Sequence, residues 1–230
     1  MMHFLEDGQS ASRIPRWQAR LRESRQETLT VLLHATKKTD VKPFLEEFHT
    51  LQTDFQGTVK HLSLLLKGYS GRMISPKTFF VSSEERQATY ATVCRLLCGV
   101  EPDLQKLHRI TALAVEHERT LLAQKPFFSA ADCLLYEILQ AAERERDGEA
   151  VERVERLESE VRRNRKQWEA CVGDALLLRQ TLIGLSGKTM PMFCERMSVA
   201  ADLEHGGAGC DPGAVAGLYG ELCAAIEACC

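Results

Sequence analysis

The 230-residue sequence predicts an all-α protein built from a few long helices. Over three long stretches, apolar residues recur at steps of three and four, the period of an α-helix. We find no run in which apolar and polar residues alternate as they do in a half-buried strand. Glycine and proline, with 15 and 7 residues, are scarce and are densest between residues 184 and 220. Apolar residues make up 44% of the chain, which is enough to bury a core.

Residues 40–73 predict the first long helix, because their apolar stripe has a mean step of about 3.6 residues. Pro43 falls in the first turn, where a missing N–H costs little. We expect the stripe to pack in the core or in a dimer interface, and it comprises Phe44, Phe48, Leu51, Phe55, Val59, Leu62, Leu66, Tyr69 and Met73.

A second helix is expected to start at Ser82 or Ser83, either of which can cap it, and to run to about Arg146. Pro102 and Pro126 lie inside this stretch, and we expect each to bend the helix rather than to end the fold.

The turn "RDGEA" precedes a third helix, whose stripe runs from Val154 to Leu185. Asn164 occupies a stripe position, where it either fixes the helix register as a buried polar group or marks a solvated gap. Trp168 is a further core or dimer-packing residue, and Pro191 predicts another bend. The stretch "EHGGAGCDPGAV" predicts a loop, and "AGLYGELCAAIEACC" predicts a short last helix.

The lengths of these elements favour a dimer. A helix over residues 82–146 would span roughly 100 Å, at 1.5 Å per residue. One chain folded as a rod of that length leaves apolar stripes uncovered, and a second chain packed along the rod would cover them.

The stretch from Gln18 to Met73, with "QARLRESRQETLTVLLHATKKTDVKPFLEEF" and "GTVKHLSLLLKGYSGRM", resembles the BAR domains of the amphiphysin and bridging-integrator group, the N-BAR type. "LLYEILQAAERERDG" and "ESEVRRNRKQWEACV" continue the resemblance, although Glu137 stands where the family has an aspartate after the tyrosine. "HGGAGCDPGAV" stands as an insertion relative to the family.

The resemblance implies a long, kinked, antiparallel three-helix bundle that pairs into a crescent-shaped dimer, with itself or with another BAR-like chain. Residues 1–38 would be a basic amphipathic segment, 39–205 the three-helix core, and 206–230 a loop and short helix that complete the bundle. Such domains bind anionic phospholipid membranes through a concave face and tips, insert their first helix, and sense or generate curvature in endocytosis and membrane remodelling.

The basic N-terminal segment is the first candidate membrane site. Residues 13–25 hold five arginines and Glu23, and apolar residues line one side of the expected helix, a pattern that suits a bilayer interface. The same pattern also suits packing on the end of the bundle with solvated arginines. The candidate residues are Arg13, Ile14, Arg16, Trp17, Arg20, Leu21, Arg22 and Arg25.

Two further basic groups are candidates. Lys37 and Lys38 either meet headgroups or help to end a helix. The third helix carries a basic cluster that either turns about two cations toward a membrane or forms a solvated face, and it comprises Arg162, Arg163, Arg165 and Lys166.

The expected distal tip is acidic, because residues 143–160 hold four arginines and eight carboxylates. A strongly membrane-binding crescent would carry basic tips, so an alternative function is a helical scaffold that recruits proteins without touching a membrane.

Signals for other functions are weak. The sequence has no HExxH, P-loop or CxxC motif, so we expect no enzyme, no cofactor and no metal site. The basic runs lack interleaved aromatic residues and the formal net charge is −3, which argues against nucleic-acid binding. No apolar run approaches the length of a membrane span, and we expect a cytoplasmic protein that attaches to membranes peripherally.

Overall fold

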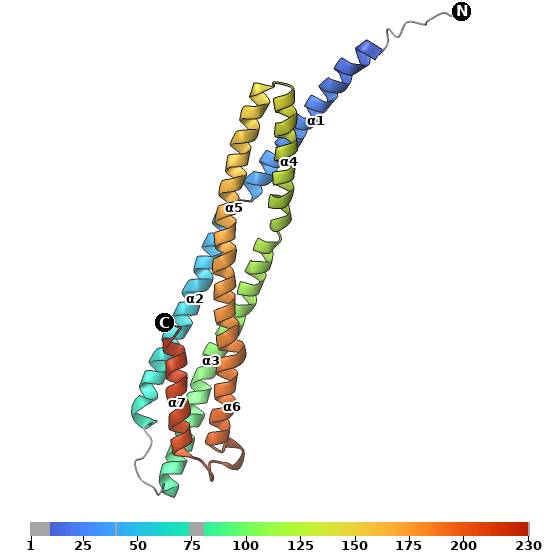
Figure 1. The fold of residues 1–230 in the computed structure, drawn as a ribbon. Coiled ribbons are helices and arrows are strands. Elements are labelled where there is room, and N and C mark those ends of the chain that lie inside the picture. The colour runs from blue at the N-terminus through green and yellow to red at the C-terminus, as the bar shows by residue number, and fades with distance from the viewer. Residues whose placement is uncertain (1–9, 40, 74–80, 230) are drawn as a thin grey trace, which may run out of the picture. The chain divides into compact units, whose positions relative to one another are not determined.

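The computed structural model describes residues 10–39, 41–73 and 81–229, and every regular element in these ranges is helical (Figure 1). The predicted all-α class is therefore confirmed for this part of the chain. The α-helices are α1 (Ser10–Lys38), α2 (Lys42–Tyr69), α3 (Ser83–Leu122), α4 (Lys125–Arg144), α5 (Gly148–Leu182), α6 (Met190–Ala200) and α7 (Pro212–Glu227). Two 3₁₀-helices, η1 (Ser70–Arg72) and η3 (Leu203–His205), and a π-helix, η2 (Ile183–Thr189), join some of them.

The chain divides into two compact units. Unit 1 comprises the residues up to Pro43 together with Leu121–Cys171, and unit 2 comprises Phe44–Thr120 together with Val172–Cys230. Unit 1 thus holds α1, α4 and most of α5, whereas unit 2 holds nearly all of α2 and α3, the end of α5, and the helices from η2 onward. The segment boundaries expected after residues 38 and 205 stay a prediction.

The predicted stripe of α2 forms part of the core of unit 2. Its central members are buried and its outer members, Phe48 and Tyr69, pack against the same core. Phe44 lies edge-on to His117 of α3, with ring centroids 6.0 Å apart. Contacts of Glu47 with His117 and of His61 with Asp103 show that α2 and α3 run antiparallel. The buried stripe residues are Leu51, Phe55, Val59, Leu62, Leu66 and Met73.

The core of unit 1 gathers one face each of α1, α4 and α5. Trp168 is buried against Phe128, with ring centroids 5.3 Å apart, and its indole Nε1 donates to the carbonyl oxygen of Leu121 at 2.7 Å. Trp168 thus lies in the core of unit 1. The other buried apolar residues of this core include Leu29, Leu32, Leu135, Ile138, Val154, Leu157 and Val161.

The expected continuous helix over residues 82–146 is wrong, because two helices occupy this stretch. A capping box starts α3: Ser82 Oγ accepts from the Glu85 N–H, and the Glu85 carboxylate accepts from the Ser82 N–H. Pro102 lies inside α3 as expected. Pro126, however, stands in the first turn of α4, after a break at residues 123–124. A proline has no N–H to continue a helix but suits the first turn of a new one.

The stretch around Pro191 is helical throughout, but its register changes. The π-helix η2 immediately precedes α6, and Pro191 is in the first turn of α6. A π-turn widens the backbone where the proline ring would meet the carbonyl of the preceding turn. The predicted distortion near Pro191 therefore takes the form of a local π-helix.

The loop before α7 is ordered by two aspartates. Asp202 has a left-handed backbone, and its carboxylate accepts from the Gly209 N–H at 2.8 Å. The Asp211 side chain caps α7 by accepting from the N–H groups of Gly213 and Ala214. Gly207 has φ +80°, and a Cβ there would lie 2.6 Å from the Tyr90 ring. Backbone freedom and close approach both favour glycine at this position.

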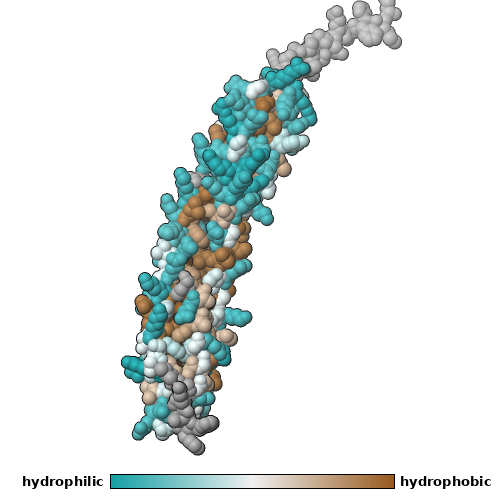
Figure 2. Space-filling model, turned by 60° about the vertical axis from the view of Figure 1, so that its left-hand side comes forward, coloured by the Kyte–Doolittle hydropathy of each residue, from teal (hydrophilic) through white to brown (hydrophobic). Residues whose placement is uncertain are grey.

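The surface is mainly hydrophilic on the face shown in Figure 2, with hydrophobic patches between the charged side chains. In unit 2 the large apolar side chains left exposed include Leu64, Leu113, Leu177 and Val199. Among the described residues, no helix has the length and apolar character that crossing a bilayer requires.

Candidate membrane-binding site

The C-terminal half of α1 is built into unit 1. Leu29 and Leu32 are buried, and the Thr36 side chain is fully buried. Asn164 of α5 donates from Nδ2 to the Thr36 carbonyl at 3.2 Å and to Thr39 Oγ1 at 3.3 Å. Of the two alternatives for Asn164, the structure therefore supports the buried polar group that fixes register. This half of α1 is held by its apolar face and by α5.

Two arginines of α1 meet the turn between α4 and α5. Arg22 Nε lies 3.2 Å from Glu145 Oε2, and the Arg25 guanidinium contacts Oε1 of the same carboxylate. Arg25 holds the pKa of the Glu145 carboxyl below its usual range; partial desolvation opposes this shift and Arg22 adds to it. These two predicted membrane residues are therefore engaged by an internal anion.

The remainder of α1 continues past this turn (Figure 1). Residues 10–21 are helical and precede the contact with Glu145, and twelve helical residues extend about 18 Å. Arg20 is exposed. The side chains of the other predicted membrane residues in this segment, Arg13, Ile14, Arg16, Trp17 and Leu21, lie outside those that the structure describes. We call residues 10–21 the α1 extension.

The end of α1 carries the predicted Lys37 and Lys38, which are both exposed in its last turn. Cations at this position interact favourably with the carbonyl end of the helix dipole. The geometry is thus compatible with the helix-ending role as well as with a headgroup contact.

The basic cluster of α5 divides into paired and unpaired cations. Arg165 Nη1 lies 2.6 Å from Asp132 Oδ2, its Nη2 donates to the Phe128 carbonyl at 2.8 Å, and its guanidinium stands 5.8 Å from the centre of the Phe128 ring. Arg162 pairs with Glu158 at 2.6 Å one turn earlier. The other two members, Arg163 and Lys166, are exposed and make no ion pair with the described residues.

The acidic tip is solvated over much of its length. Glu143, Glu149 and Glu155 are exposed, and Glu152 pairs with Arg156 on the surface of α5. Exposed helix pairs of this kind contribute about 0.3–0.5 kcal/mol each. The tip therefore presents a surface on which carboxylates outnumber free cations.

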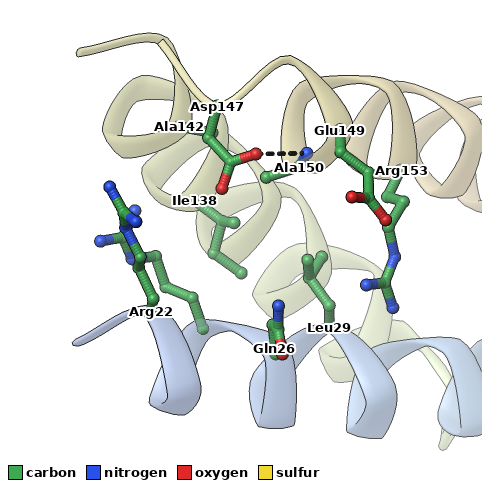
Figure 3. Close-up of a pocket in the computed structure, with 10 residues that line it drawn as sticks. Arg22, Gln26, Leu29, Ile138, Ala142, Asp147, Glu149, Ala150 and Arg153 are labelled. Carbon is green, nitrogen blue, oxygen red and sulfur yellow. Dashed lines mark hydrogen bonds between the residues drawn. The ribbon is translucent and has the colours of Figure 1, made fainter. Parts of the chain in front are cut away.

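A small cavity lies between α1, α4 and α5 beside the Arg22–Glu145 contact, with a volume of about 80 Å³. Figure 3 shows Leu29 and Ile138 in its middle, Arg22 at one end and Arg153 at the other. The Asp147 carboxylate accepts from the Ala150 N–H at 3.1 Å and so caps the start of α5. This cavity was not anticipated from the sequence.

Several polar contacts had no signal in the sequence pattern. In unit 2, His117 is buried and its Nδ1 lies 3.2 Å from Glu47, while Asp103 is buried beside His61. The nearest available signal was a charged residue on an apolar stripe, as with Asp103 between Val100 and Leu107. Among the described residues, no group of three or more His, Cys, Asp or Glu side chains is placed to hold a metal ion.

In comparisons with known proteins, no family model, no curated protein and no solved structure matches the chain.

Proposed function

We propose that this protein is a non-enzymatic, peripheral membrane-binding module that contacts anionic bilayers through the α1 extension. The observation that carries the proposal is the position of α1 in unit 1. Its C-terminal half is anchored by buried residues, whereas the helix continues past the turn between α4 and α5. A helix whose C-terminal half is anchored in the core, and whose basic N-terminal part extends beyond it, has a suitable geometry for contact with a bilayer interface.

The sequence of the extension supports this proposal. Ile14, Trp17 and Leu21 follow at steps of three and four, so they share one side of the helix. The extension holds three arginines, Arg13, Arg16 and Arg20, and no carboxylate. At about 1 kcal/mol per basic residue near an anionic leaflet, this segment supplies a few kcal/mol of attraction, before the tryptophan inserts.

We also propose the finer architecture that the BAR resemblance implies, a three-helix bundle that pairs with a second BAR-like chain. The apolar side chains that unit 2 leaves exposed, among them Leu113, Leu177 and Val199, support an added partner surface. In this proposal the dimer acts in membrane remodelling, by its shape and its basic surface rather than by chemistry.

Co-sedimentation with vesicles tests the proposal. We expect binding to phosphatidylglycerol-containing vesicles that falls with salt, and no binding to neutral phosphatidylcholine vesicles. Trp17→Glu should weaken binding at least tenfold, because it places a carboxylate on the apolar side of the extension. Val31→Glu is the control, since Val31 is exposed on the anchored half of α1. Equal binding by the two variants, or binding that ignores lipid charge, would contradict the proposal.

A second candidate function is a scaffold that recruits proteins and touches no membrane. The solvated carboxylates of the tip favour it, because they repel anionic lipid and suit a basic protein surface. In that case the protein would remain in the supernatant with every vesicle composition.

A further inference from the structure

Two guanidinium groups contact one carboxylate just after the α1 extension. Arg22 and Arg25 contact opposite oxygens of Glu145. The Arg25 and Glu145 side chains are only 18% and 26% exposed, whereas that of Arg22 is 57% exposed. Two of the five arginines of residues 13–25 are therefore paired with an internal carboxylate in the structure.

The position of Glu145 is unfavourable for α4 itself. Glu145 is the C-terminal capping residue of α4, where the helix dipole presents its negative end. A carboxylate there is repelled by the terminal carbonyl groups. The two arginines offset that repulsion, and the same contact attaches α1 to the end of α4.

A phosphate group offers the same arginines an equivalent partner. Guanidinium groups bind carboxylates and phosphates through the same planar, bidentate geometry. We propose that Arg22 and Arg25 form a binding site for the phosphate of an anionic lipid headgroup, and that Glu145 occupies this site when no membrane is present. Glu145 thereby sets the affinity of the protein for anionic membranes. This inference rests on the proposed function.

The surrounding charges limit what the site accepts. The cavity beside the pair adds one arginine, Arg153, and two carboxylates, Asp147 and Glu149. With the two arginines and Glu145, the charges of this region cancel. Displacing Glu145 leaves one uncompensated positive charge, which suits a phosphodiester with a single negative charge better than a headgroup with several phosphates.

The test compares Glu145→Gln with Glu143→Gln. Both changes remove one negative charge from the same end of α4, but Glu143 is exposed and its side chain forms no hydrogen bond or ion pair with the described residues. On vesicles of phosphatidylglycerol and phosphatidylcholine, E145Q should bind about five- to twenty-fivefold more tightly than E143Q, at about fivefold per released arginine. Equal affinities of E145Q and E143Q, with wild-type protein still binding, would overturn the inference and leave the proposed function intact.

A mutant cycle separates release of the arginines from loosening of α1. In an Arg22→Gln, Arg25→Gln background, E145Q should bind no better than E143Q, because the site no longer exists. A persistent advantage of E145Q in that background would overturn the inference. Failure of every variant to bind would overturn both the inference and the proposed function.

Inorganic phosphate distinguishes the two sources of the ligand. Replacing chloride with phosphate at equal ionic strength should raise the melting temperature of E145Q more than that of E143Q if the site also takes free phosphate. If E145Q binds vesicles more tightly than E143Q but phosphate raises the two melting temperatures equally, the site is one for headgroups presented by a membrane.

Discussion

Replacing Asn164 by alanine should loosen the anchored half of α1 from α5. The change removes the two hydrogen bonds that Nδ2 makes, at 3.2 Å to Thr36 and 3.3 Å to Thr39. The Thr36 carbonyl still accepts from Thr39, whose N–H lies at 3.1 Å and whose hydroxyl lies at 2.7 Å, so no buried acceptor is orphaned. The expected loss is therefore about 1–2 kcal/mol, at the lower end for a buried polar pair.

Urea unfolding followed by circular dichroism measures this loss, and amide hydrogen exchange locates it. Protection of the amide groups should fall most in residues 29–38, because these form the C-terminal part of α1, where Asn164 makes its hydrogen bonds. Arg163→Ala is the matched control on the adjacent residue, which is exposed, and it should change stability by less than about 0.5 kcal/mol. A loss for Asn164→Ala no larger than that of the control would refute the anchoring role.

Three further perturbations test other contacts. Arg165→Gln should cost about 1–2 kcal/mol in urea unfolding while Arg163→Gln costs almost nothing, because Arg165 binds Asp132 and the Phe128 carbonyl of α4 whereas Arg163 is exposed without an ion pair to the described residues; the reverse order would contradict the assignment. Gly207→Ala should lower stability by about 1–3 kcal/mol, since its Cβ would meet Tyr90 at a positive φ, and an unchanged melting temperature would argue against this loop conformation. Because the pKa of Glu145 is lowered by folding, its stabilising contribution is present above the ordinary value of 4.5 and is lost as pH falls through the folded pKa; the acid limb of the melting-temperature profile should flatten in E145Q, and an identical limb would refute the pairing.

The spacing of apolar residues was sufficient to predict the helices that carry a single, continuous apolar stripe. The stripe of α2 and the position of Trp168 on α5 followed from the 3.6-residue period, because a buried face repeats with the helix turn. The capping of α3 by Ser82 was among the two alternatives that residue type suggested.

The break before α4 could not be decided in the same way. Pro126 is compatible both with a bend inside a helix and with the first turn of a new one, and only the packed structure selects the second. The pattern of apolar residues is the same for a bent helix and for two successive helices, so it cannot separate these outcomes.

Contacts between distant residues were equally inaccessible. Arg25 and Glu145 are 120 positions apart, and Arg165 pairs with Asp132 of another helix. Nothing in the sequence distinguishes these arginines from their solvated neighbours. In the structure, Arg165, Arg22 and Arg25 are each engaged by a carboxylate on another part of the chain.

Trp17 lies in the α1 extension, so its fluorescence can report directly on the proposed contact of this extension with anionic bilayers. The chain has two tryptophans, so a Trp168→Phe variant leaves Trp17 as the single indole. With phosphatidylglycerol vesicles its emission should shift to shorter wavelength and be quenched by lipids brominated near the headgroup, whereas neutral vesicles should leave it unchanged. Emission from Trp17 that is the same with and without anionic vesicles would contradict membrane contact by the α1 extension.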